Sequence, residues 1–304
     1  MIVSHRVTVE EDGFVLLHIL RGCMGLSAAA VRGLKAHGGL HVDGVLRFTT
    51  YQVRAGELVT ADVSLGERDG DNVPEDGPLA VLWEDEGLIA VNKPPGMIVH
   101  PSRAKNVGTL ANFVVGYLQK SGQRPNCHIV NRLDRDTSGA VLFAKNAHMK
   151  AKVVEALQTA EKRYTALVLG ELSPPDGVID LPIRRFEPQN MLRIVAVDGR
   201  RAVTHYRTVK RGMLGGQTCS ALELTLETGR THQIRVHCLH RGVPLVGDRL
   251  YCTEESAELS GVLGVERQLL HSSYLGFWHP LTGEWVEVFA PIEDPGFVGL
   301  LERL

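Results

Sequence analysis

Hydrophobic positions near the start of the chain recur at helical spacing. Two groups of apolar residues, separated by Gly22 and Gly25, predict two short helices, and Ser27 is placed to cap the second. Residues 37–45 then predict a turn, a short strand and a hairpin, and residues 53–59 predict a further strand. The apolar positions of the two helices are Phe14, Leu17, Leu20, Leu26, Val31 and Leu34.

An acidic segment, ERDGDNVPEDG at residues 67–77, interrupts the pattern. It contains almost nothing apolar and several residues typical of turns, so it is predicted to be a linker. The expected organisation is a small domain at residues 1–66, an acidic linker at 67–78 and a large domain at 79–304.

From residue 79 onward, short runs typical of β-strands dominate. They occupy residues 79–83, 88–92, 139–144, 163–169, 202–207, 220–226 and 285–290, and residues 271–284 resemble a hairpin. Residues 109–119 and 146–160 are the best helical windows. Strands outnumber helices without a regular alternation, so the predicted fold class is α+β with a mixed or antiparallel sheet.

Net charge and cysteine content exclude some classes of protein and some kinds of site. The formal net charge is −2 and the pI about 6.7, so any nucleic-acid site must be a local basic cluster. The five cysteines form no CxxC pair, which argues against a disulfide framework or a zinc ribbon. With no apolar leader and no long apolar run, we expect a cytoplasmic protein without a membrane segment.

The densest cluster of reactive side chains is the polar segment 131–139, which leads into an apolar strand. Asp134 and Asp136 lie two residues apart in a loop that also carries two arginines, and a carboxylate beside two arginines can be positioned for catalysis. A charged surface turn explains the same pattern at least as well. Two carboxylates on one extended face would also allow acid–base chemistry, although this signal is weak.

A second cluster follows another predicted strand, at residues 227–237. Arg235 is suited to pairing with a carboxylate, and His232 and Gln233 to bonding a phosphate or a base edge. The spacing of His232, His237 and His240 fits no common metal motif, so no metal site is expected. The ring of Tyr164 is suited either to packing in the core or at the sheet edge, or to stacking on a flipped base. No phosphate-binding loop is present, so no ATP or NAD cofactor is expected.

Five blocks occur in one order: AVNKPPGMIVHP (90–101), NRLDRDTSGAVLFAKN (131–146), KRYTALVLGEL (162–172), ETGRTHQIRVHCLHRGVPLVGDRLY (227–251) and LLHSSYLGFWHPLTGE (269–284). Together they resemble the RluA-type family of pseudouridine synthases. The resemblance implies a pseudouridine synthase catalytic domain with a mixed, mainly antiparallel central sheet, acting on ribosomal or transfer RNA without a cofactor. More weakly, residues 1–66 resemble a small α/β S-four-like RNA-binding domain.

The resemblance also implies roles for individual residues. Asp134 corresponds to the catalytic carboxylate, Arg235 to its partner and Tyr164 to the aromatic residue on the base. Residues implied in substrate or RNA contact are Arg132, Asn131, Arg230, His232, Gln233, Leu270 (with Leu269 as the alternative), Arg32 and Lys35.

This chain departs from the family pattern in two places. Asn131 stands where many members have histidine, and Ala28 to Ala30 replace a basic helix start, which leaves Arg32 and Lys35 to meet phosphates. Two other classes of protein are alternatives: a non-catalytic RNA-binding protein and a glycosidase with a carboxylate pair. A non-catalytic relative should lack one of the three implied catalytic residues, and all three are present. A glycosidase needs carboxylates on both sides of a bond, and Asp134 and Asp136 are too close in sequence for that. An isomerase is therefore expected. Because the basic residues are reserved for RNA and no exposed apolar seam is evident in the sequence, a monomer is expected.

Overall fold

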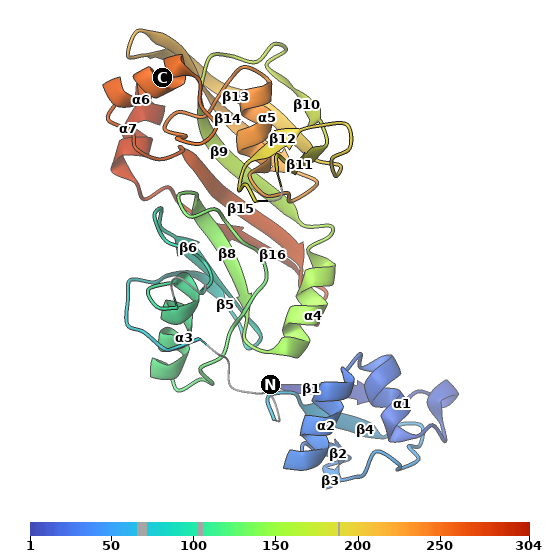
Figure 1. The fold of residues 1–304 in the computed structure, drawn as a ribbon. Coiled ribbons are helices and arrows are strands. Elements are labelled where there is room, and N and C mark those ends of the chain that lie inside the picture. The colour runs from blue at the N-terminus through green and yellow to red at the C-terminus, as the bar shows by residue number, and fades with distance from the viewer. Residues whose placement is uncertain (66–71, 102–105, 188) are drawn as a thin grey trace.

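The computed structural model describes residues 1–65, 72–101, 106–187 and 189–304 (Figure 1). Residues 67–71 of the predicted linker lie outside the described residues. Within the described ranges, no helix is both long and apolar enough to cross a membrane.

The N-terminal region, residues 1–65, has its own sheet and its own core. Its antiparallel sheet has the order β1-β4-β2-β3, and its core residues all lie between positions 7 and 63. Its elements are β1 (Ile2–Arg6), η1 (Val9–Glu11), α1 (Leu16–His18), η2 (Ile19–Cys23), α2 (Ala28–His37), β2 (Leu40–Val42), β3 (Val45–Leu46) and β4 (Leu58–Asp62).

Most local predictions for this region are confirmed. Ser27 caps α2 by accepting a hydrogen bond from the Ala30 amide at 3.1 Å, and β2 and β3 form the predicted hairpin. The strand expected at residues 53–59 was wrong in its start, since β4 begins only at Leu58. Gly56, with a φ of +90°, turns the chain just before that strand.

The rest of the chain is built on a ten-stranded sheet with the path β10-β13-β14-β9-β15-β8-β6-β5, to which β16 and β7 are added. Its one parallel pair among the described residues is β8 with β15, so the predicted mixed, mainly antiparallel α+β fold is confirmed. The strands are β5 (Ala80–Glu84), β6 (Leu88–Lys93), β7 (His128–Ile129), β8 (Ser138–Ala144), β9 (Glu161–Leu169), β10 (Asp176–Asp180), β13 (Val203–Leu214), β14 (Gln217–Leu226), β15 (Leu270–Trp278) and β16 (Trp285–Phe289), with β11 (Ile183–Arg185) and β12 (Arg193–Val195) in a separate pair.

Helices pack around this sheet. The two predicted helices appear as α3 (Leu110–Lys120) and α4 (Ala147–Ala156), while α5 (Gln233–His240), α6 (Glu254–Val262) and α7 (Pro295–Arg303) were not predicted. In α5 every residue from 233 to 238 is buried, whether polar or apolar, so this stretch has no solvent-exposed face and its polar and apolar residues do not follow a helical period.

The N-terminal region lies at one end of the molecule, near α4 (Figure 1). The amino group of Met1 lies 3.3 Å from the Glu86 carboxylate, and the Arg124 guanidinium donates to the Ser64 carbonyl. These polar contacts join the two parts, whose apolar cores are separate.

Candidate active site

Four neighbouring strands in the middle of the large sheet carry the predicted catalytic residues. In the order β14-β9-β15-β8, Arg235 follows β14, Tyr164 lies on β9, Leu270 begins β15 and Asp134 precedes β8. Residues distant in the sequence therefore meet at one open pocket, which holds about 380 Å³ of empty space when the solvent at its mouth is included. It is lined by Arg132, Leu133, Asp134, Thr137, Tyr164, Leu226, Arg230, His232, Gln233, Ile234, Arg235 and Leu270.

The loop that carries Asp134 is a turn and not an extended segment. The Thr137 amide donates to the Asp134 carbonyl at 3.2 Å, so Asp134 and Asp136 do not share the extended face that their spacing allowed. Asp136 does not line the pocket. Among the described residues, Asp134 supplies the one carboxylate of the pocket lining.

Lys93, the last residue of β6, anchors this loop. It is fully buried and donates to the carbonyls of Pro94, Met97 and Arg135 at 2.8, 2.9 and 2.8 Å. Burial lowers the pKa of its amine to about 7, although the charges of Asp136 and Asp134 act in the opposite direction. Lys93 thus fixes the position of the Asp134 loop through its hydrogen bond to the Arg135 carbonyl.

Arg235 is held between two carboxylates. Its Nε and Nη2 donate to Asp248 at 2.7 and 2.8 Å, and its Nη1 donates to Asp134 at 3.0 Å. Burial alone would disfavour the guanidinium charge, but the hydrogen bonds and charge of Asp248, together with Asp134, raise its pKa. Asp248 was not singled out from the sequence, although it lies in the GDRLY end of a matching block.

His232 adopts a left-handed backbone conformation, with φ of +59°, just before α5 begins. Such a conformation is strained for a non-glycine residue, and strain of this kind is concentrated at functional sites. The His232 Nδ1 lies 2.7 Å from the Tyr251 hydroxyl, and its Nε2 lies 3.8 Å from Asp134 Oδ1. Burial lowers the pKa of the ring, against the charge of Asp134, and so favours its neutral form.

Tyr164 and Leu270 give the pocket an apolar wall. Tyr164 pairs across the sheet with Ser272 on β15, and both Tyr164 and Leu270 belong to the same buried cluster. Burial raises the pKa of the Tyr164 phenol to about 12, to which the charge of Asp134 contributes. The alternative wall residue, Leu269, packs in a different cluster, so Leu270 is the leucine at this site.

The residues expected to contact RNA fall into three groups. Arg132 and Arg230 are exposed and line the pocket. Gln233 also lines it, but its amide donates to Val203 and Thr204 and its oxygen accepts from Thr228 and the Arg230 amide, so it is fully engaged within the protein.

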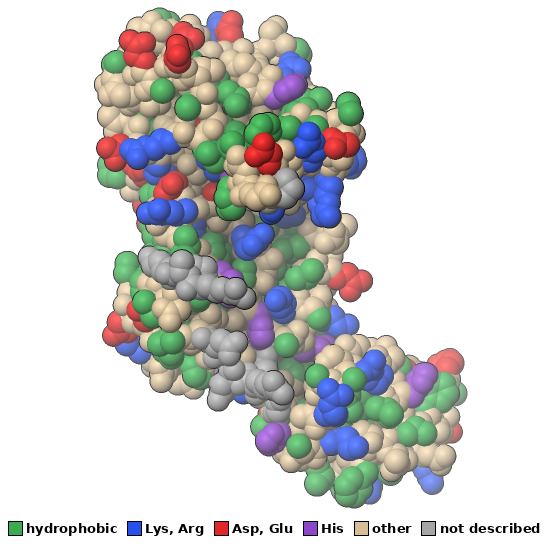
Figure 2. Space-filling model, in the orientation of Figure 1, with side chains coloured by type: hydrophobic (Ala, Val, Ile, Leu, Met, Phe, Trp, Pro, Cys, Tyr) green, Lys and Arg blue, Asp and Glu red, His purple; other side chains and the backbone are tan. Residues whose placement is uncertain are grey.

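Asn131, Arg32 and Lys35 do not line the pocket. The Asn131 side chain bonds the backbone of β8 at Ala140 and Leu142, which ties the Asp134 loop to that strand. Arg32 and Lys35 are exposed on α2 in the N-terminal region. Figure 2 shows Lys and Arg side chains both there and along the middle of the visible face.

Comparisons with known proteins show the family of this chain. The family model described as RNA pseudouridylate synthase matches residues 87–240. The chain is 39% identical over 274 residues to YlyB, an uncharacterised RNA pseudouridine synthase of Bacillus subtilis (strain 168), covering 88% of this chain and 86% of the relative.

A second relative is the ribosomal large subunit pseudouridine synthase D of Xanthomonas campestris pv. campestris, 38% identical over 251 residues, or 80% of this chain and 74% of the relative. The solved structure of human RNA pseudouridylate synthase domain containing 1 has a TM-score of 0.58 and 26% identity, covering 73% of this chain and 86% of that one. The chain therefore belongs to the RNA pseudouridylate synthase family. It is an RNA pseudouridine synthase, an isomerase that acts on RNA.

Proposed function

We propose that this enzyme isomerises a uridine of large-subunit ribosomal RNA to pseudouridine, with Asp134 as the catalytic carboxylate. One observation carries the assignment of the residue: Asp134 is the carboxylate of the pocket lining among the described residues, and it is paired there with a buried arginine. The choice of RNA is supported by a relative that is named for the large ribosomal subunit.

In the proposed reaction the target nucleotide leaves the RNA stack and enters the pocket. Asp134 acts on its ribosyl unit, so that the uracil detaches, rotates and rejoins through carbon. Tyr164 and Leu270 provide a flat apolar surface on which the base is held during this step. Because the phenol of Tyr164 has its pKa raised to about 12, it enters the reaction neutral and can donate a hydrogen bond to the base.

RNA binding is proposed to use two surfaces. Arg132 and Arg230 at the pocket mouth are placed to contact phosphates beside the flipped nucleotide. Residues 1–66 are proposed as an S-four-like domain whose Arg32 and Lys35 meet phosphates further away, with 67–78 as the linker to the catalytic domain at 79–304. We propose that the enzyme works as a monomer in the cytoplasm, where ribosomal RNA is available.

A glycosidase is less consistent with this pocket. Such enzymes place two carboxylates on opposite sides of the scissile bond, whereas Asp136 does not line the pocket. A non-catalytic RNA-binding protein would have no need for the buried pair that fixes Asp134.

A pseudouridine map of total RNA tests the proposal. Carbodiimide labelling at nucleotide resolution is compared between cells with the gene, cells without it, and cells that carry Asp134→Asn or Asp136→Asn. We expect one or more large-subunit uridines to be modified only with the wild-type and Asp136→Asn proteins. A gene-dependent site in transfer RNA alone would contradict the proposed substrate, and a site retained with Asp134→Asn would contradict the proposed residue.

A further inference from the structure

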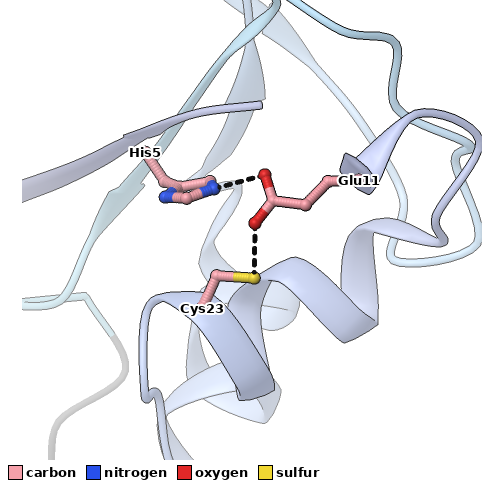
Figure 3. Close-up of side chains that lie close together, drawn as sticks. All are labelled: His5, Glu11 and Cys23. Atoms are coloured by element: carbon pink, nitrogen blue, oxygen red, sulfur yellow. Dashed lines mark hydrogen bonds and ion pairs between the residues drawn. The ribbon is translucent and has the colours of Figure 1, made fainter. Parts of the chain in front are cut away.

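A second group of reactive side chains lies in the N-terminal region, outside the catalytic pocket. His5 on β1, Glu11 at the end of η1 and Cys23 at the end of η2 point toward one another (Figure 3). One donor atom from each residue lies within 4.8 Å of the other two. The His5 Nε2 is 2.8 Å from Glu11 Oε2, and the Cys23 Sγ is 2.9 Å from Glu11 Oε1.

We propose that His5, Glu11 and Cys23 form a binding site for one transition metal ion, with Zn²⁺ as the ion that they match best. Imidazole nitrogen, carboxylate oxygen and thiolate sulfur are the three donor types that Zn²⁺ takes in proteins. Three protein ligands leave a fourth tetrahedral position for water, as in open zinc sites.

The present spacing is close to what an ion requires. Bond lengths of about 2.0 to 2.3 Å place donors on a tetrahedral ion roughly 3.3 to 3.8 Å apart. His5 and Cys23 contact different oxygens of Glu11, and one of these oxygens serves as the ligand. Because one donor atom of each residue lies within 4.8 Å of the other two, the donors need to approach one another by no more than about 1.5 Å, which side-chain rotation can supply.

Glu11 is already fixed in place, because its Oε2 also accepts from the Thr8 amide at 2.8 Å in a capping box. Its side chain is 14% exposed and that of His5 is 24% exposed, whereas Cys23 is exposed and gives an ion access from solvent. Ion binding forms a bond between the metal and sulfur as the S–H bond of Cys23 breaks, and the proton passes to solvent.

The bound ion would join three separate segments at the edge of the N-terminal sheet. None of the three ligands lines the catalytic pocket, and none is among the residues proposed to contact RNA. The expected effect is on the N-terminal region itself, since a ligand that binds only the folded state raises the temperature of unfolding.

Co²⁺ is the probe for the test, because cobalt bound to a thiolate gives a charge-transfer absorption band. The full chain, without a histidine tag, is titrated with Co²⁺ under reducing conditions. We expect saturation at one ion per chain, displacement of the cobalt by one equivalent of Zn²⁺, and loss of the band in Cys23→Ser. Cys252→Ser is the matched control, since Cys252 is also an exposed free cysteine but lies outside the cluster.

Absence of the band, titration without saturation, or a band that survives in Cys23→Ser would overturn the proposal and leave the cluster as a hydrogen-bonded network only. Circular dichroism and pseudouridine formation by Cys23→Ser show that the variant is folded. As a second variant, Glu11→Gln keeps the thiol but removes the carboxylate, and we expect it to weaken Co²⁺ binding at least tenfold.

Discussion

Arg235 meets Asp248 through two parallel hydrogen bonds, from Nε at 2.7 Å and from Nη2 at 2.8 Å. This fork fixes the plane of the guanidinium and leaves Nη1 free to donate to Asp134 at 3.0 Å. Asp248 is therefore a positioning residue: it acts on the proposed catalytic carboxylate through Arg235.

Replacing Asp248 by Asn should destabilise the fold, because the buried charge of the Arg235 guanidinium loses one of its two carboxylate partners. The Asp248 side chain is fully buried and that of Arg235 is 8% exposed. We expect the free energy of unfolding to fall by about 3 kcal/mol, measured by urea denaturation. The control is Glu223→Gln, which breaks the exposed pair with Arg207 and should cost less than about 1 kcal/mol. Equal losses for both variants would contradict this account.

Lys93 should make the free energy of unfolding depend on pH between about pH 7 and pH 10.5. Because burial lowers its folded-state pKa from 10.5 to about 7, the unfolded chain holds one more proton between those two pH values. The contribution of this group to the free energy of unfolding therefore rises with pH, by at most about 3 kcal/mol from pH 7 to pH 9.

The comparison is the change in unfolding free energy between pH 7 and pH 9 for wild type and for Lys93→Met. We expect wild type to gain more stability than the variant over this range, whatever the absolute loss caused by the substitution. The same change in both proteins would show that the Lys93 amine stays charged throughout.

Tyr164→Phe separates the ring of the tyrosine from its hydroxyl. The ring remains to hold the base, so we expect unchanged RNA affinity, whereas kcat should fall about 100-fold because a positioned hydrogen-bonding group is lost. Tyr274→Phe is the control, since Tyr274 bonds Glu287 and does not line the pocket. Wild-type turnover by Tyr164→Phe would restrict Tyr164 to packing.

The arrangement of the large sheet could be anticipated only in part from sequence. Strands β6 and β8 each contain a continuous apolar run, and the sequence predicts both nearly to the residue. The pairing that matters for the site, β8 parallel to β15, joins segments far apart in the chain and leaves no local pattern. Helix α5 was missed because it buries Gln233, Arg235 and His237 together with its apolar residues.

The candidate site, like the sheet, could be predicted only in part from the sequence. Asp134, Arg235 and Tyr164 were chosen through the resemblance to the family, and the structure brings all three to one pocket. Lys93 and Asp248 were not chosen, because a charged residue looks the same in sequence whether it is solvated or buried. Their partners, the Arg135 carbonyl and Arg235, are defined only by the fold.

The most direct test of the central claim is the conversion of uridine to pseudouridine by purified Asp134→Asn and Asp136→Asn. The substrate is ribosomal RNA from cells that lack the gene, and RNA affinity is measured in parallel. We predict that Asp134→Asn binds the RNA but forms no pseudouridine, whereas Asp136→Asn retains turnover. Pseudouridine formation by Asp134→Asn at a rate near that of wild type would contradict the assignment of Asp134 as the catalytic carboxylate.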